Sequence, residues 1–185
     1  MKKPCKKIGK GLLWGIGSFI AAAGAAATGW IIYSRKYVRH DMKLDKAIDA
    51  ERKDFQSEIA GRISYYVDNS AKGVPLVLLH SVNAAPSAFE MKPIFNRFRG
   101  ERPVYALDLP GFGFSERSDR IYSPKLYQNA ITDFLRDVVG EPADVVTLSL
   151  SSEFAALSAA HDPEHQRSLV MISPTGFGPP KPGNL

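Results

Sequence analysis

A serine stands at the point where a predicted strand gives way to a predicted helix. Residues 145–148 form a β-branched, apolar run that is typical of a buried strand, and residues 154–160 have good helix propensity. Ser149 lies between them, so a sharp turn there would point the first amides of the helix at the serine oxygen. An alkoxide or oxyanion formed at that position would be stabilised, and the pattern therefore indicates a reactive hydroxyl.

The neighbours of Ser149 decide whether such a turn can form. The backbone turns so sharply that the residues two positions before and two positions after the serine must be small. Ser151 meets this requirement, whereas Thr147 is β-branched and tests it more severely. The alternative interpretation is an ordinary serine that caps the helix starting near Ser151 or Ser152.

Composition limits the classes of function that the chain can have. Its 185 residues suffice for one domain, and an apolar content of 44% with 23% charged residues is typical of a globular protein. The single cysteine, Cys5, excludes an intrachain disulfide. Residues 1–60 hold 12 Lys and Arg against 6 Asp and Glu, and residues 61–185 hold 12 against 13. The globular part is thus close to neutral, and we expect no nucleic-acid partner.

The N-terminal region has the pattern of a membrane segment. A basic tail, residues 1–10, precedes residues 11–33, which contain no charged residue and would reach about 34 Å as a helix. We expect a single-pass transmembrane or signal-anchor helix that contacts membrane lipid; a signal peptide cleaved after residues 21–27 is the alternative. Basic residues flank both ends, so the side of the membrane on which the domain lies stays open. Residues 34–60 are predicted to form a helical connector.

Residues 61–185 alternate between strand and helix patterns. Apolar or alternating runs predict strands near residues 63–67, 74–80, 103–107, 145–148 and 168–173. Helices are predicted over residues 86–99, over a segment that starts after Ser123 and ends at Gly140, and after the serine turn. This alternation predicts an α/β domain with a mostly parallel sheet and right-handed crossovers.

Three blocks in this order resemble the α/β-hydrolase fold family, across roughly residues 61–178. Residues 76–80, followed by Ser81, are similar to the family strand that ends in His-Gly before the oxyanion loop. Residues 108–115, Asp-Leu-Pro-Gly-Phe-Gly-Phe-Ser, match the D-x-P-G-x-G-x-S turn without departure. Residues 145–152 resemble the nucleophile strand and its G-x-S-x-G elbow, with Thr147 and Ser151 in place of the glycines. The resemblance implies a partial, mostly parallel α/β-hydrolase sheet with flanking helices, preceded by the transmembrane helix.

The same resemblance implies roles for individual residues. Ser149 would be the catalytic nucleophile that forms an acyl-enzyme. The oxyanion hole would be formed by the backbone N–H of Leu150 and by that of Val82, beside Ser81, which replaces the family glycine. Asp108 is expected to cap its turn, and His80 to be a structural residue at the end of its strand. No metal ligands, phosphate loop or dinucleotide fingerprint are present, so we expect no cofactor.

The residues that would activate the serine are missing from this pattern. The family order is nucleophile, then acid, then histidine, and only His161 and His165 follow Ser149. Both should lie about 15 Å away along the helix, and His40 lies beside the apolar segment. We therefore expect a C-terminally incomplete, membrane-anchored serine hydrolase that acts on a small-molecule ester or other acyl substrate. The alternative is a non-catalytic, membrane-tethered binding or scaffold protein. Haloalkane dehalogenase and epoxide hydrolase chemistry would need a carboxylate at position 149, whereas carbon–carbon bond hydrolases and cofactor-free perhydrolases of this fold also use a serine and stay open as alternatives.

Overall fold

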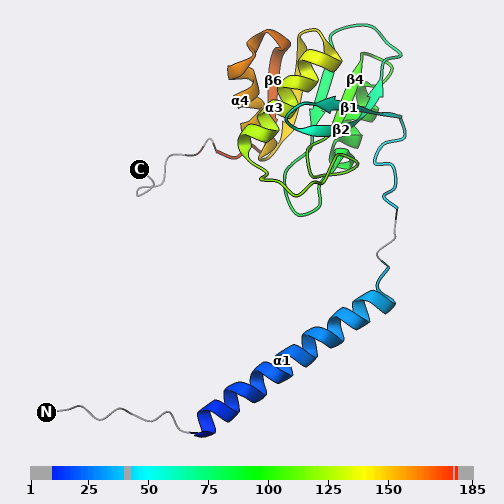
Figure 1. The fold of residues 1–185 in the computed structure, drawn as a ribbon. Coiled ribbons are helices and arrows are strands. Elements are labelled where there is room, and N and C mark those ends of the chain that lie inside the picture. The colour runs from blue at the N-terminus through cyan, green and yellow to red at the C-terminus, as the bar shows by residue number, and fades with distance from the viewer. Residues whose placement is uncertain (1–9, 40–42, 177, 179–185) are drawn as a thin grey trace, which may run out of the picture. The chain divides into compact units, whose positions relative to one another are not determined.

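The structure is a computed structural model that describes residues 10–39, 43–176 and 178. The chain forms two compact units, residues 1–43 and residues 44–185. Helix α1, Lys10–Tyr37, belongs to the first unit, and all strands belong to the second (Figure 1). Residues 1–9 of the predicted basic tail lie outside the described residues.

The membrane span predicted at residues 11–33 is not supported. Residues in this range are helical, as part of α1. Within the part of the chain that the structure describes, however, no helix combines the length and the apolar character needed to cross a membrane. The middle of α1 is rich in alanine and glycine, and its last turn carries Arg35 and Lys36.

Of the helical connector predicted at residues 34–60, only residues 34–37 are helical in the described part of the chain. Residues Glu51–Ser57 form strand β1, which pairs in antiparallel register with β2, Gly61–Asp68. The strand is polar because it is the outer strand of the sheet, and its one inward aromatic side chain, Phe55, lies edge-on to Phe134 with ring centroids 5.5 Å apart. Pairing with β2 therefore outweighs the charged, helix-like composition of the segment.

Within the described residues, six strands form one sheet in the order β1-β2-β4-β3-β5-β6 (Figure 1). The pairs β3–β4, β3–β5 and β5–β6 are parallel, whereas β1–β2 and β2–β4 are antiparallel. This arrangement confirms the expected α/β class and the mostly parallel sheet. The remaining strands are β3 Leu76–Leu79, β4 Val104–Asp108, β5 Ala143–Leu148 and β6 Gln166–Ile172.

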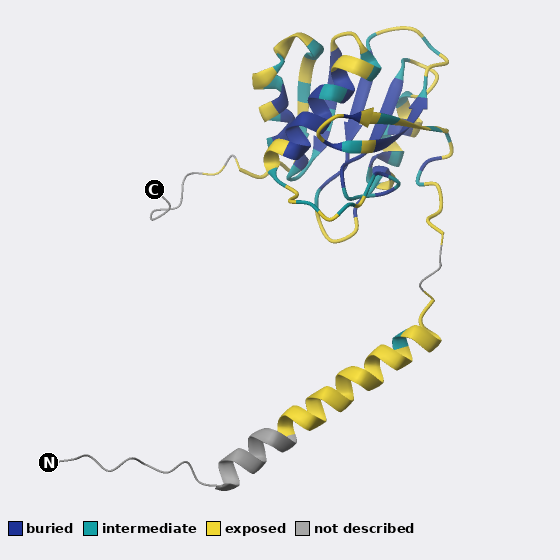
Figure 2. Ribbon diagram, viewed as in Figure 1, coloured by how far each residue is buried: buried dark blue, intermediate teal, exposed yellow. Residues whose placement is uncertain are grey.

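Helices lie on both faces of the sheet and bury its side chains (Figure 2). The helix predicted after Ser123 forms α3, and Ser123 is its N-cap residue. The helical segment η2 follows α3 directly and ends at Gly140, which has a left-handed conformation with φ 71°. The helical segments of the second unit are η1 Ala88–Met91, α2 Lys92–Phe98, α3 Pro124–Phe134, η2 Leu135–Val139, α4 Ser151–His161 and η3 Pro163–His165.

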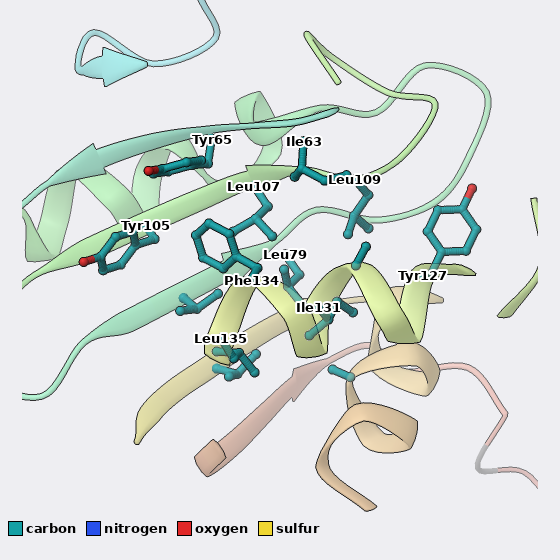
Figure 3. Packing of buried hydrophobic residues seen from close by; sticks show 14 of the residues in the cluster. Ile63, Tyr65, Leu79, Tyr105, Leu107, Leu109, Tyr127, Ile131, Phe134 and Leu135 are labelled. Atoms are coloured by element: carbon teal, nitrogen blue, oxygen red, sulfur yellow. The ribbon is translucent and has the colours of Figure 1, made fainter. Parts of the chain in front are cut away.

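Each face of the sheet has its own hydrophobic core. On the α3 and α4 face, Phe134 is fully buried and lies edge-on to Tyr65 and Tyr105, with ring centroids 5.0 and 5.8 Å away (Figure 3). On the other face, the buried Phe95 of α2 packs in a cluster with Tyr66 and Leu78. Packing on both faces fixes the sheet, and the carboxyl ends of its parallel strands are thereby held at one edge.

Asp144 fixes the opposite end of the parallel strands. Its carboxylate accepts hydrogen bonds from Arg167 at 2.6 Å, Ser168 at 2.6 Å and Arg102 at 2.7 Å. Charge-assisted bonds from Arg167 above all hold the pKa of Asp144 well below its usual range. This cluster ties β5 to β6 and to the segment before β4, and so sets which residues reach the carboxyl edge of the sheet.

Candidate active site

Ser149 lies in the turn between β5 and α4, as predicted. Its φ is 58°, and Ser149 and Ser173 are the two non-glycine residues with positive φ in the described chain. The N–H of Ser149 donates to the carbonyl oxygen of Ile172 at 2.9 Å, and its own carbonyl accepts the N–H of Ser152 at 3.1 Å. Hydrogen bonds on both sides therefore hold the serine in a left-handed conformation that costs on the order of 1–3 kcal/mol.

The hydroxyl of Ser149 has no structural partner in the described part of the chain. The N-cap residue of α4 is Leu150, and no side chain caps this helix. Ser149 is half-buried, and its Oγ forms no hydrogen bond with any described residue. The alternative interpretation of an ordinary capping serine is therefore not supported.

Thr147 and Ser151 fit the turn in place of glycines because their hydroxyls are hydrogen-bonded. Both residues are fully buried. Thr147 Oγ1 lies 2.8 Å from Ser152 Oγ, and Ser151 Oγ lies 2.9 Å from the carbonyl oxygen of Leu148. A buried hydroxyl with a partner costs little, so the elbow forms without the family glycines.

The loop after β3 begins beside the serine turn. Leu79 of β3 pairs with Thr147 of β5 in the parallel sheet, so the segments that follow these two strands leave the sheet side by side. The N–H groups of Val82 and Leu150 donate to no acceptor among the described residues. The N–H of Ser81, in contrast, donates to Glu90 Oε2 at 2.8 Å. Both predicted oxyanion donors are therefore free of acceptors among the described residues.

His80 and Asp108 hold the loops around this edge, as expected from the sequence. His80 is fully buried, its Nε2 accepts the N–H of Leu109 at 2.9 Å, and its Nδ1 lies 2.5 Å from the carbonyl oxygen of Ser81. Nδ1 therefore carries the proton. The Asp108 carboxylate accepts the N–H groups of Ala88 and Phe114, each at 2.9 Å. Both side chains are thus engaged in hydrogen bonds that hold these loops.

Burial of His80 predicts a specific loss of stability in mild acid. Desolvation lowers the pKa of His80 below its ordinary value of about 6.5. Between the lowered folded pKa and about 6.5, the unfolded chain binds more protons than the folded chain, so the free energy of unfolding falls as the pH falls through this window. Urea unfolding at several pH values between about 5 and 7.5 measures the slope.

The control for this effect is His80→Gln, which keeps a donor and an acceptor but does not titrate. Its free energy of unfolding should depend less steeply on pH than that of the wild type in the same window. The lowered pKa of Asp144 affects stability mainly below about pH 5, where the carboxyl of the unfolded chain begins to bind protons. Equal slopes for the two proteins would contradict the assignment.

No described histidine is placed to take a proton from Ser149. His161 is the last residue of α4, about 15 Å along the helix from the turn, and His165 Nδ1 lies 3.0 Å from Asp162. His40 lies outside the described residues. Among the residues that the structure describes, no group of three His, Cys, Asp or Glu could hold a metal ion.

Glu90 and Asn83 are described residues near the site that the sequence did not single out. The Glu90 carboxylate binds Ser81 and Asn83, the two neighbours of Val82. The sequence signal for such a residue was Ser81 itself, because a serine in place of the family glycine brings a hydroxyl that needs a hydrogen-bond partner. The identity of that partner depends on how the following helix folds back.

The chain belongs to the alpha/beta hydrolase family, whose model matches residues 76–185. A curated relative, the 2-(acetamidomethylene)succinate hydrolase of Mesorhizobium japonicum, is 26% identical over 136 residues, which cover 72% of this chain and 48% of the relative. The chain therefore spans about half the length of this relative.

Solved structures show the same fold. The haloalkane dehalogenase DatA of Agrobacterium tumefaciens C58 is 25% identical with a TM-score of 0.57, and the match covers 68% of this chain and 42% of the dehalogenase. A probable hydrolytic enzyme of Pseudomonas aeruginosa PAO1 is 22% identical with a TM-score of 0.61, over 73% of this chain and 44% of that enzyme. The match to the second enzyme shows the fold alone.

Proposed function

We propose that this protein is a serine hydrolase that acts on an ester or another acyl compound through an acyl-enzyme. The observation that carries the proposal is the Ser149 hydroxyl, which lies in the β5–α4 turn at φ 58° without a hydrogen-bond partner among the described residues. A residue held in a strained conformation whose side chain has no structural role is typical of a functional position. In this proposal the N–H groups of Leu150 and Val82 stabilise the negative charge of the oxyanion.

The reaction begins when Ser149 Oγ attacks the carbonyl carbon of the substrate. The hydroxyl proton passes to a general base, and the carbonyl oxygen becomes an oxyanion that accepts hydrogen bonds from the N–H groups of Leu150 and Val82. The oxyanion then re-forms the carbonyl, the leaving group takes a proton, and an acyl ester remains on Ser149. Water hydrolyses this ester and restores the serine. We assign neither the general base nor its acid to a described residue.

A small acyl compound is the proposed substrate class. The curated relative is named as a hydrolase of 2-(acetamidomethylene)succinate, a small molecule. The dehalogenase shares the fold, but a serine hydroxyl at position 149 favours acyl transfer, because displacement of a halide in this fold uses a carboxylate nucleophile. Activity measurements with a panel of esters and amides would identify the substrate.

A fluorophosphonate probe tests the proposal, because it phosphonylates activated serines. The probe should label the full-length protein, and peptide mapping should place the adduct on Ser149. Ser149→Ala should abolish labelling. Ser173→Ala is the matched control, because Ser173 is a second serine with positive φ, 47°, at the end of the adjacent strand. No labelling of a correctly folded wild type would reject the proposal and favour a non-catalytic binding protein.

Association with a membrane stays a prediction from the sequence. It depends on the basic residues that flank residues 11–33 and on the absence of charge within them. Carbonate extraction of a membrane fraction from cells that make the full-length protein measures it. Recovery of the protein in the supernatant without extraction would contradict membrane localisation.

A further inference from the structure

Glu90 binds both residues that flank Val82. Its Oε2 accepts the backbone N–H of Ser81 at 2.8 Å, and its Oε1 accepts the Ser81 hydroxyl at 3.0 Å. Oε1 also lies 3.3 Å from the side-chain amide of Asn83, which in turn donates to Ser81 Oγ at 2.6 Å. The carboxylate, the hydroxyl and the amide thus form a closed network around the loop that carries Val82.

A second contact fixes the peptide plane that contains the Val82 N–H. This N–H shares its peptide bond with the carbonyl group of Ser81, which accepts a hydrogen bond from His80 Nδ1 at 2.5 Å. In a trans peptide the C=O and N–H groups point in opposite directions, so the Val82 N–H is directed away from His80. His80 therefore sets the orientation of this plane, and Glu90 binds the residues on either side of Val82.

The segment that carries Glu90 is anchored in the core. It lies in η1 between the buried side chains of Ala88 and Met91, and the N–H of Ala88 donates to the buried Asp108 carboxylate. Movement of this segment would displace these core contacts. The loop before Val82 is consequently tied to the hydrophobic core and not only to its own backbone.

The network also explains why serine can replace the family glycine at position 81. Ser81 is not among the described non-glycine residues with positive φ, so its backbone does not need glycine. Its side chain is buried, and a buried hydroxyl needs a hydrogen-bond partner, which Glu90 and Asn83 provide. The serine is therefore an additional point of attachment for the loop.

We propose that Glu90 is a positioning residue that holds the Val82 N–H in the orientation needed to stabilise the oxyanion. This inference rests on the proposed function. Loss of one preorganised oxyanion donor lowers turnover by about 10²–10³-fold in other enzymes. Glu90→Ala leaves the donor in place but frees its loop, so we expect acylation to slow by about 10–100-fold with substrate KM changed less than about threefold.

The experiment compares the rate constant for phosphonylation of Ser149, and kcat and KM for an ester, across variants of the full-length protein. Glu90→Gln keeps an acceptor for the Ser81 N–H and should restore most of the rate. Glu116→Ala is the matched control, because Glu116 Oε2 accepts a backbone N–H, that of Arg62, at 3.1 Å outside this loop. It should react as the wild type does. Ser81→Ala removes one arm of the network and should give an intermediate loss.

The outcomes separate the two proposals. A wild type that does not react at Ser149 rejects the proposed function and this role with it. A reacting wild type whose rate is unchanged in Glu90→Ala rejects the role of Glu90 alone. Thermal unfolding accompanies each variant: a rate loss that follows the unfolding midpoint across Glu90→Ala, Glu90→Gln and Glu116→Ala would show a general structural role and overturn the inference. Slow acylation by a stable Glu90→Ala, rescued by glutamine, supports it.

Discussion

Replacing Ser149 with alanine is expected to lower ester hydrolysis by the full-length protein by at least about 10³-fold, because it removes the proposed nucleophile that forms the acyl-enzyme. The change removes only the hydroxyl, which has no hydrogen-bond partner in the described chain. The fold and its free energy of unfolding should therefore change little. Measurement of kcat on a short-chain aryl ester, together with urea unfolding, tests both parts of this expectation.

Ser149→Gly provides a control that separates chemistry from backbone conformation. It should be as inactive as Ser149→Ala, but glycine adopts φ 58° without strain. We expect its free energy of unfolding to exceed that of Ser149→Ala by about 1 kcal/mol. An alanine variant that keeps more than about a tenth of the wild-type rate would contradict the assignment of Ser149 as nucleophile.

Gly113→Ala should destabilise the domain by at least about 3 kcal/mol, because it combines backbone strain with a collision in the core. Gly113 has φ +50°, and a Cβ there would lie 2.0 Å from Asp108 Cγ and 2.2 Å from both carboxylate oxygens. Asp108 cannot move aside easily, because it is fully buried and accepts the N–H groups of Ala88 and Phe114. Chemical denaturation gives the change in the free energy of unfolding.

The matched control is Gly100→Ala. Gly100 also has positive φ, +76°, but a Cβ there would meet no atom within 4 Å. This variant should lose only about 1 kcal/mol, the cost of placing alanine in a left-handed conformation. The difference between the two variants measures the collision with Asp108. Equal losses in the free energy of unfolding would show that the close packing of Gly113 against Asp108 does not exclude a larger residue from this turn.

Much of the domain could be predicted because its local patterns agree with its tertiary structure. The apolar run before Ser149 becomes β5, and the turn at residues 108–115 follows β4 as its motif requires. The pattern failed at residues 51–57, whose charged composition favours a helix. This segment forms a strand because it pairs with β2, the next strand along the chain. The pattern of residues within one segment does not show which strand it will pair with.

The candidate site was predictable to the extent that it follows from a motif. Ser149, Leu150 and Val82 occupy positions that the turn and loop patterns specify, and their roles stay predictions. Glu90 was not predictable in the same way, because its contacts to Ser81 and Asn83 arise when η1 folds back against the loop. His80 shows the same limit: its place at the end of β3 followed from sequence, whereas the nitrogen that carries its proton depends on Leu109 and Ser81.

A crystal structure of the full-length protein after reaction with a fluorophosphonate tests the central claim most directly. The account predicts a phosphorus atom bonded to Ser149 Oγ, with the phosphonyl oxygen about 2.7–3.1 Å from the backbone nitrogens of both Val82 and Leu150. An adduct on another residue would contradict it. So would an adduct on Ser149 whose phosphonyl oxygen points to solvent, beyond hydrogen-bond distance of both nitrogens.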